Sequence, residues 1–423
     1  MITSHFPFGT SESFIESEMS VISGSFKKII IISGDAKGSQ TRSIPDNAVV
    51  HRYNTSTTFR GFMELPWLVI KNFRVITKLF TEEVRFRKTI SSCLSARQKI
   101  FLVKKIIKAL QLRDYIGKTL NREIPGEDAV LYSYWFKTGA HAIALINKPG
   151  SVKIARAHGS DLYEESAPLK YIPLQKFTSE SLNALFFISG YGKNYFEKKF
   201  GNISCNLLIS RLGTNRPDNT EMPKYFPQDE FIIVSCSYLI ALKRIDLLIR
   251  SLALLKAGKK IRWIHFGDGE LRESLASLAE ELLSPVKKIQ YEFRGHVPNT
   301  GILNFYASGK VSLLVNTSSS EGIPVSIMEA QSYGIPVIAT DTGGVREIIT
   351  TGTGTIIPVD FGPAELAVLI DYYARLTDTE MKQIRRNAFN NWMKNFNAES
   401  NYRDFLNQLN CILETSNKSP EDK

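Results

Sequence analysis

The chain has 423 residues, which is too long for one ordinary domain, so we expect two domains that each bury a core. Hydrophobic residues make up 43% and charged residues 22% of the sequence, as in a globular protein, and no apolar run approaches the length of a membrane span. The net charge of +11 indicates an anionic partner, which could be a nucleic acid, an anionic membrane or a phosphorylated substrate.

The N-terminus, residues 1–7, lacks the basic start, apolar stretch and small-residue cleavage site of a secretory signal, so we expect a cytoplasmic protein. Four cysteines are widely separated and form no C-x-x-C pair: Cys93, Cys205, Cys236 and Cys411. Neither a zinc site nor a disulfide framework is therefore expected, and the cysteines are predicted to be reduced.

Short apolar, β-branched runs alternate with longer helical stretches along the chain, a pattern typical of βαβ units and parallel sheets. The predicted strands of the first half are residues 28–33, 129–133, 152–157 and 184–188. Those of the second half are residues 231–235, 261–266, 288–293, 311–316 and 336–339. The sequence therefore predicts an α/β fold with two doubly wound parallel sheets and a cleft between two domains. Ligands of such sheets bind at the carboxyl ends of the strands.

A stretch of turn formers divides the two sets of strands. Residues 211–219 are poor in apolar side chains, and Pro223 and Pro227 follow them. We therefore predict a first domain over 1–214, a linker over 215–228, a second domain over 229–415, and a disordered tail over 416–423. The last helix of the second domain can cross back to the first.

Positive charge concentrates in residues 71–122, where acidic residues are scarce. The basic residues that interleave there with Val, Ile, Leu and Phe are Lys78, Arg85, Arg87, Lys88, Lys99, Lys104, Lys105 and Lys108. One interpretation is the solvated face of a helix. The other is a basic amphipathic surface that rests on anionic lipid.

Residues 318–330, SSSEGIPVSIMEA, directly follow the predicted strand 311–316. Pro324 fits the first turn of a helix that we predict from 324 to about 333. The free N–H groups and positive dipole end of such a helix suit a diphosphate. Glu321 and Glu329 could accept hydrogen bonds from the hydroxyls of a sugar and a ribose. The alternative is a helix capped by Ser and Glu that binds nothing.

Residues 321–344, EGIPVSIMEAQSYGIPVIATDTGG, closely resemble the E-x7-E signature of glycosyltransferase family 4. The resemblance implies a retaining sugar transferase with the GT-B fold of two Rossmann-like domains, the first for the acceptor and the second for the nucleotide sugar. It assigns Glu321 to the donor hexose, as a catalytic residue, and Glu329 to the nucleotide ribose. The main-chain N–H groups that would meet the sugar and phosphates are those of Gly322, Ile323 and Val325.

Three more segments of the second half resemble the same family. FGDGE at 266–270 contains Gly267, and FRGHV at 293–297, which contains Val297, matches a segment that flanks the base. VSCSYLIALKR at 234–244 corresponds to the loop that supplies cations to the diphosphate. Its candidates are Ser237, Lys243 and Arg244. Most relatives carry an arginine where this chain has Tyr238, and we expect Arg244 to replace it in part.

Two segments of the first half also resemble the family. RAHGSD at 156–161 follows a predicted strand, and relatives place a histidine there near the donor sugar. The resemblance implies a catalytic role for His158 and makes Asp161 a further candidate, against the alternative of a structural histidine. PFGTSESF at 7–14 resembles the first strand-to-helix loop of such enzymes, in which Gly9 would let the backbone approach the substrates; a plain N-cap turn is the alternative.

The resemblance implies transfer, with retention, of a hexose or N-acetylhexosamine from UDP or GDP to a glycan or lipid-linked acceptor. We expect a role in bacterial cell-envelope polysaccharide synthesis, including lipopolysaccharide, at the inner face of the cytoplasmic membrane. No cofactor or metal is expected, because no D-x-D pair follows a strand and His-rich or Cys-rich clusters are absent. The alternatives are a nucleotide-sugar epimerase of the same fold and a nucleic-acid-binding protein. The latter is disfavoured because no binding module is recognisable.

Overall fold

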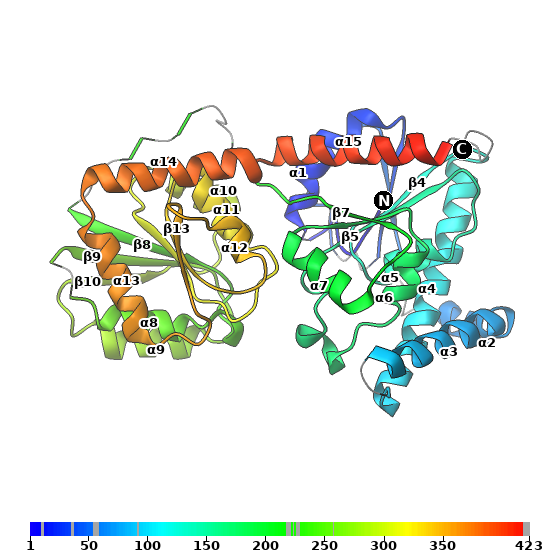
Figure 1. Cartoon of the computed structure of the whole chain (residues 1–423), viewed down its shortest axis with the longest axis horizontal. Helices are drawn as coiled ribbons and strands as arrows, with labels where there is room; N and C mark the ends of the chain where they lie inside the picture. Colours follow the sequence, from blue (N-terminus) through cyan, green and yellow to red (C-terminus); the bar gives the residue numbers. More distant parts are fainter. Residues whose placement is uncertain are drawn as a thin grey trace. The chain divides into compact units, whose positions relative to one another are not determined.

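The computed structural model describes residues 1–9, 12–34, 38–53, 59–90, 93–216, 221–222, 224–225, 229–256 and 258–417 (Figure 1). The chain divides into two compact units. Unit 1 comprises Met1–Leu212 and Ala398–Lys423, and unit 2 comprises Gly213–Asn397. Each unit has its own parallel β-sheet and its own hydrophobic core.

The sheet of unit 1 has seven parallel strands in the order β3-β2-β1-β4-β5-β6-β7. They are β1 (Ile2–Thr3), β2 (Ile29–Ser33), β3 (Ala48–Arg52), β4 (Val130–Ser133), β5 (Val152–Ala157), β6 (Ala184–Phe187) and β7 (Asn206–Ile209). The central strand β1 pairs with both β2 and β4, so that Ile2 lies opposite Ile32 and Ser133. The strand order reverses direction at β1, and ligands of a doubly wound sheet bind beside such a reversal.

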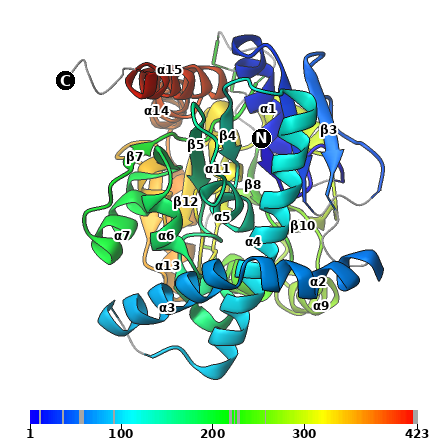
Figure 2. The same cartoon turned by 90° about the vertical axis from the view of Figure 1, so that its right-hand side faces the viewer.

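Different helices cover the two faces of this sheet (Figures 1 and 2). The helices of unit 1 are α1 (Ser13–Ile22), α2 (Phe59–Lys71), α3 (Phe73–Ile90), α4 (Ala96–Glu123), α5 (Thr138–Ala144), α6 (Gln175–Glu180), α7 (Gly190–Phe200) and α15 (Ala398–Asn417). Along β2, Ile29 and Ile31 pack with α1 and α15, whereas Ile30 and Ile32 pack with α4 and α5. Because both faces are covered, this strand consists almost entirely of isoleucine.

Helix α15 is part of unit 1 although it follows unit 2 in the sequence. Its apolar residues recur at intervals of three and four, which places them on one side of the helix. Tyr402, Phe405, Leu409 and Ile412 are buried there against α1 and the strands. This apolar side therefore attaches the end of the chain to unit 1.

The sheet of unit 2 has six parallel strands in the order β10-β9-β8-β11-β12-β13. The strands are β8 (Glu230–Cys236), β9 (Lys260–Phe266), β10 (Ile289–Phe293), β11 (Leu313–Asn316), β12 (Val337–Thr340) and β13 (Gly354–Ile357). The helices are α8 (Ile245–Ala253), α9 (Arg272–Leu283), α10 (Asn299–Ala307), α11 (Val325–Ser332), α12 (Val345–Ile348), α13 (Pro363–Arg375) and α14 (Asp378–Asn395).

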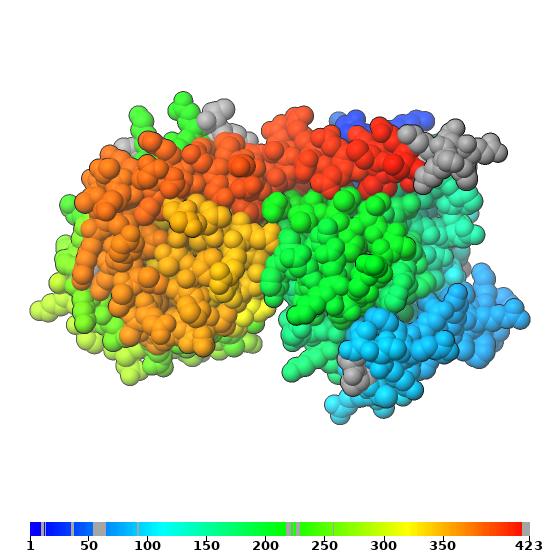
Figure 3. Space-filling view, in the orientation of Figure 1, coloured from blue at the N-terminus to red at the C-terminus, as the bar shows by residue number. Residues whose placement is uncertain are grey.

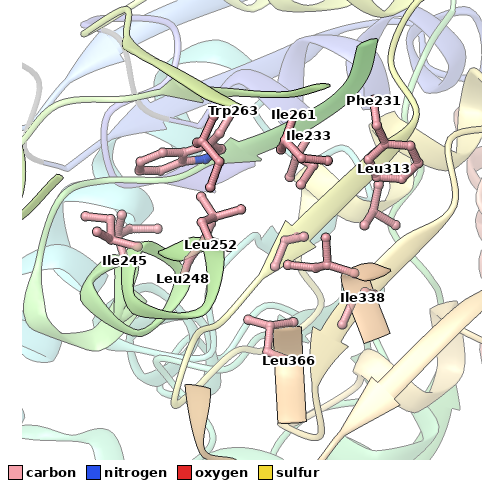
Figure 4. Close-up of a cluster of buried hydrophobic side chains, with 14 of the residues drawn as sticks. Phe231, Ile233, Ile245, Leu248, Leu252, Ile261, Trp263, Leu313, Ile338 and Leu366 are labelled. Carbon is pink, nitrogen blue, oxygen red and sulfur yellow. The ribbon is translucent and has the colours of Figure 1, made fainter. Parts of the chain in front are cut away.

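The core of unit 2 lies between this sheet and α8, α9 and α13 (Figure 4). On α8, Ile245, Leu248 and Leu252 lie on one side of the helix and are buried. The indole of Trp263 lies among them, fully buried, and donates a hydrogen bond of 2.9 Å to the Ser235 hydroxyl. The packed core therefore fixes the positions of β8 and β9, and with them the loops that follow their carboxyl ends.

The predicted α/β fold with two parallel sheets is confirmed, and each of the nine predicted strands lies within one or two residues of an observed one. The strands not predicted are β1, β3, β7 and β13. Three of them, β3, β7 and β13, are four or five residues long and form edges of their sheets, and β1 has only two residues. The helix predicted from Pro324 begins one residue later, at Val325, because Pro324 has an extended conformation with ψ of 114° and precedes the helix.

Parts of the predicted linker and tail lie outside the described residues, namely 217–220, 223, 226–228 and 418–423. Within the predicted linker, Arg216 is buried and packs on unit 2, where its Nη1 donates to the carbonyl of Ser332 at 2.9 Å. Within the predicted tail, α15 extends to Asn417. No helix in the described part of the chain is both long enough and apolar enough to cross a membrane.

Candidate functional site

A pocket of about 290 Å³ lies in unit 2 at the carboxyl ends of β8, β9 and β11. We call it the unit 2 pocket. Its lining residues are Cys236, Ser237, Tyr238, Lys243, Phe266, Gly267, Asp268, His296, Val297, Ile302, Glu321, Pro324, Val325 and Ser326. Six residues predicted from the sequence are among them: Ser237, Lys243, Gly267, Val297, Glu321 and Val325. The pocket therefore lies where a parallel α/β sheet binds its ligands.

Lys243 and Glu321 form an ion pair at this pocket. Lys243 Nζ lies 2.6 Å from Glu321 Oε1, and the side chains are 17% and 13% exposed. Lys243 ends a short 3-10 turn after β8, and the loop after β11 holds this turn in place. In that loop, Thr317 Oγ1 donates to the Lys243 carbonyl at 2.8 Å and the Ser319 N–H donates to the Leu242 carbonyl at 2.9 Å. One cation and one carboxylate are thus brought together from segments about 80 residues apart in the sequence.

The first turn of α11 also faces the unit 2 pocket, because Pro324, Val325 and Ser326 all line it. No side chain caps this end of the helix. Main-chain N–H groups at a helix N-terminus, together with the positive end of the helix dipole, favour an anion. The pocket therefore presents two sources of positive potential, Lys243 and the helix end.

Glycines shape the loops around the pocket. Gly267 has φ of 139°, and a Cβ there would lie 1.8 Å from the Ser237 carbonyl oxygen. Gly343 has φ of 52°, and a Cβ there would lie 1.9 Å from the Glu321 carbonyl oxygen. Any larger residue at either position would displace a loop that lines the pocket. The absence of a side chain at Gly267 thus allows the loop that contains Ser237 to approach its backbone closely.

Glu329 and two other predicted residues lie near the pocket without lining it. Glu329 is on α11, and its Oε1 accepts a hydrogen bond of 2.7 Å from Asn299 Nδ2 on α10. Burial raises the pKa of Glu329 to about 7, although the bond from Asn299 opposes this rise. Gly322 and Ile323 form the backbone between Glu321 and the helix, and the Gly322 carbonyl accepts the Gly344 N–H at 2.7 Å.

Arg244 does not reach the unit 2 pocket, contrary to the expectation that it partly replaces a missing arginine. Its Nε donates to the Thr317 carbonyl at 2.8 Å and its Nη1 to the Val359 carbonyl at 2.5 Å. Its backbone is left-handed, with φ of 48°, so its side chain leaves the turn in a different direction from Lys243. Tyr238, at the position of that arginine in relatives, lines the pocket and is 70% exposed.

A second group of predicted residues lies in unit 1, at the carboxyl end of β5. The His158 imidazole is 6% exposed and packs against Trp135, with ring centroids 4.3 Å apart. Its Nδ1 is 3.7 Å from the Asp161 carboxylate, which is longer than a hydrogen bond, and neither ring nitrogen has a partner in the described structure. Burial lowers the pKa of His158, so the ring is neutral at neutral pH. Asp161 is fully buried and accepts the N–H groups of Phe136 and His158 at 2.8 and 2.6 Å.

Two residues missed by the sequence analysis complete this group, Glu12 and Trp135. The Glu12 carboxylate accepts the main-chain N–H groups of Ser4, His5 and Phe6 at 3.1, 2.6 and 2.6 Å. It also accepts the indole N–H of Trp135. Glu12 thus joins the loop after β1 to the loop after β4. Only its place in the motif 7–14 could have pointed to it.

Gly9 of the same motif has φ of 68°, so glycine suits the position. The next two residues of the motif, Thr10 and Ser11, lie outside the described residues. Among the residues that the structure describes, no group of three or more His, Cys, Asp or Glu side chains is arranged to hold a metal ion.

Comparisons with known proteins concern the second half of the sequence and the fold of the whole chain. Residues 218–390 match the family model described as glycosyl transferases group 1. A putative colanic acid biosynthesis glycosyltransferase of Salmonella typhimurium is 26% identical over 213 residues, which cover 49% of this chain and 51% of that protein. A GDP-mannose-dependent monoacylated alpha-(1-6)-phosphatidylinositol monomannoside mannosyltransferase of Corynebacterium glutamicum is 25% identical over 219 residues, which cover 48% of this chain and 56% of that protein.

The chain thus spans about half the length of these curated relatives. Among solved structures, sucrose-phosphate synthase from Thermosynechococcus elongatus matches 98% of this chain and 98% of its own, with a TM-score of 0.70 and 13% identity. That likeness concerns the fold, which is GT-B. Residues 218–390, which match the model of the group 1 glycosyl transferases, contain the unit 2 pocket.

Proposed function

We propose that this protein is a retaining glycosyltransferase that moves a hexose or N-acetylhexosamine from a nucleotide diphosphate to a glycan or lipid-linked acceptor. The observation that carries the proposal is the ion pair of Lys243 and Glu321 beside the N-terminus of α11, in the unit 2 pocket. A diphosphate needs fixed positive groups, and a sugar needs hydrogen-bond acceptors. This pocket offers both within a few ångströms.

Each group has a distinct part in this proposal. Lys243 has three N–H donors, of which Glu321 uses one, so the others can bind phosphate oxygens as negative charge develops on the leaving group. Glu321 accepts hydrogen bonds from hydroxyls of the donor sugar. Glu329, which lies further along α11, accepts hydrogen bonds from the ribose of the nucleotide. In unit 1, the neutral His158 has no partner for its ring nitrogens among the described residues, so it can bind a hydroxyl of a substrate.

The proposed mechanism is attack by the acceptor hydroxyl on the face from which the diphosphate departs. Two carboxylates line the described pocket, and the proposal uses neither as a nucleophile: Glu321 is paired with Lys243, and Asp268 is paired with Arg272. Cys236 lines it, but burial raises the pKa of its thiol to about 12, which keeps it protonated and weakly nucleophilic. We propose that no divalent metal is required, since Lys243 and the helix end can meet the developing charge.

The names of the relatives support the proposed class of acceptor. One acts in colanic acid synthesis and another on a phosphatidylinositol mannoside, so a polysaccharide or glycolipid of the bacterial envelope is the proposed product. We place the reaction at the inner face of the cytoplasmic membrane. The basic residues of α3 and α4 support a contact with anionic lipid there.

A panel of sugar nucleotides tests the proposal. UDP-glucose, UDP-N-acetylglucosamine and GDP-mannose would each be added, and the unfolding temperature measured. A donor at 100 times its Kd stabilises the folded state by about 2.7 kcal/mol. Transfer of labelled sugar to envelope glycolipids and the anomeric configuration of the product would then be determined. Conversion of the donor to another sugar nucleotide without transfer would instead indicate an epimerase, and an inverted product would contradict retention.

A further inference from the structure

Helices α2 and α3 lie end to end across α4, on the side of unit 1 away from its sheet (Figures 1 and 2). Helical hydrogen bonds continue through Asn72 between them, from Asn72 N–H to the Leu68 carbonyl at 3.0 Å and from Ile76 N–H to the Asn72 carbonyl at 2.9 Å. Asn72 is 5% exposed, and its Oδ1 accepts a hydrogen bond of 3.0 Å from Arg113 of α4. One side of the α2–α3 pair is therefore fixed against α4.

The other side of the pair exposes three large apolar side chains that we call the apolar ridge: Trp67, Ile70 and Phe73. They are 68%, 68% and 64% exposed and lie three residues apart, which places them along one side of the helices. The core beneath does not need them, since Leu79 is buried there and Leu68 and Ile76 pack against the same cluster. Figure 3 shows α2 and α3, in blue, standing out at the edge of unit 1.

Positive charges predominate around the apolar ridge. Between residues 65 and 80 the charged side chains are Lys71, Arg74 and Lys78; Glu64 precedes this segment in the sequence, and Lys78 Nζ lies 3.9 Å from the Glu82 carboxylate that follows it. All three are exposed. At 100° per residue, these cations and the apolar ridge lie on the same half of the helix, opposite Asn72. An apolar strip edged by cations and ending in a tryptophan is the composition of a helix that lies in a membrane interface.

We propose that the apolar ridge inserts into the headgroup region of an anionic bilayer, with Lys71, Arg74 and Lys78 bound to lipid phosphates. The inference deepens the proposed membrane contact and rests on it, but it does not depend on the identity of the donor sugar. According to this inference, the protein binds the bilayer by inserting apolar side chains as well as by the attraction of its positive charges to the lipid. A second copy of this chain is a poorer occupant, because a symmetric pairing of two such faces would bring their cations together.

The fluorescence of the wild-type protein provides the first test. Of the four tryptophans, Trp263 and Trp392 are fully buried and Trp135 is half-buried, so Trp67 is the exposed one. Vesicles of phosphatidylglycerol and phosphatidylcholine should shift the emission to shorter wavelength, and lipids brominated on the acyl chains should quench it. Trp67→Phe should remove the shift. Emission unchanged by vesicles that do bind the protein would overturn the insertion while leaving an electrostatic contact.

The second test compares two sets of substitutions by flotation. Replacing Trp67, Ile70 and Phe73 by serine should weaken vesicle binding at least about tenfold, since each loses part of a buried apolar surface. The matched control is Val368→Ser with Tyr372→Ser on α13, which removes side chains of similar exposure, 67% and 55%, from unit 2. The control should bind as wild type. Thermal stabilisation by a sugar nucleotide should be the same in both variants, which shows that they are folded.

The remaining outcomes separate this inference from the proposed reaction. If the ridge variant and the wild type bind vesicles equally well, the apolar ridge does not insert into the bilayer. Failure of wild type to bind at low salt would overturn the whole membrane contact, while stabilisation by a donor would leave the transferase proposal standing. Dimers that form without lipid and disappear in the ridge variant would show that the ridge pairs with a second copy.

Discussion

The two units use the charged side chains at their sheet edges in different ways. In unit 2, Lys243 and Glu321 pair with each other beside a pocket and remain 17% and 13% exposed. In unit 1, Asp161 and Glu12 are 0% and 6% exposed, and both are occupied by N–H groups of the surrounding loops. Charge is thus available to a ligand in unit 2, whereas in unit 1 it fixes the loops around a neutral His158.

From this contrast we expect substitution of Lys243 to have the largest effect on activity. Lys243→Ala should lower kcat about 10²–10³-fold, because a fixed donor to the leaving diphosphate is lost. Activity should survive EDTA. The matched control is Arg250→Ala, which removes an exposed cation of α8 outside the pocket and should leave turnover unchanged. A nearly normal Lys243→Ala enzyme, or an EDTA loss restored by magnesium, would contradict the proposed leaving-group site.

Glu321→Gln should have the next largest effect. Replacing a charged acceptor by a neutral one costs about 1.5–3 kcal/mol, or roughly a ten- to 150-fold loss in kcat/KM. The unfolding midpoint should stay near that of wild type, since the side chain faces a pocket. Glu365→Gln, at an exposed position on α13, serves as the control. Full activity of the Glu321 variant would show that this carboxylate does not bind the donor sugar.

Substitution in unit 1 should act on stability instead. Glu12→Gln keeps one carbonyl oxygen but points an amide N–H₂ at groups that are themselves donors, so we expect a loss of roughly 1–3 kcal/mol in the free energy of unfolding. Trp135→Phe removes only one of the donors to Glu12 and should cost less. Denaturant titration measures both. A Glu12→Gln protein as stable as wild type would mean that the carboxylate does not hold the loops.

Glu329 gives the smallest effect and a pH dependence. Its pKa in the folded protein is about 7, above the ordinary 4.5, so the unfolded chain loses this proton first as pH rises. The contribution to stability is therefore complete below pH 4.5 and falls between 4.5 and 7. Glu329→Gln, which resembles the protonated acid, should be more stable than wild type at pH 8 by about 1 kcal/mol after allowance for partial exposure, and equal at pH 4. A difference that is independent of pH would contradict the raised pKa.

Local patterns in the sequence were enough to predict much of the fold and many of the residues that line the unit 2 pocket. The run of isoleucines in β2 and the apolar runs of the other predicted strands are consecutive in the chain, so their pattern needs no tertiary information. The same holds for the motif from Glu321 to Gly344, where loop, helix and strand follow one another directly. Gly267 lies in a motif recognised from the sequence, but the close contacts that require glycine there and at Gly343 are with the carbonyl oxygens of Ser237 and Glu321, which lie elsewhere in the chain.

Only the tertiary structure decided which side chains meet across long distances in the chain. Glu12 and Trp135 are 123 residues apart, and nothing near either of them predicts their hydrogen bond. Arg244 adjoins Lys243, yet its left-handed backbone turns its side chain toward carbonyl groups. Charge in residues 71–122 was visible in the sequence, but the exposure of Trp67 depends on which side of α2 packs against α4. A single amphipathic pattern does not determine this, because burial depends on the neighbouring helix as well as on the residues themselves.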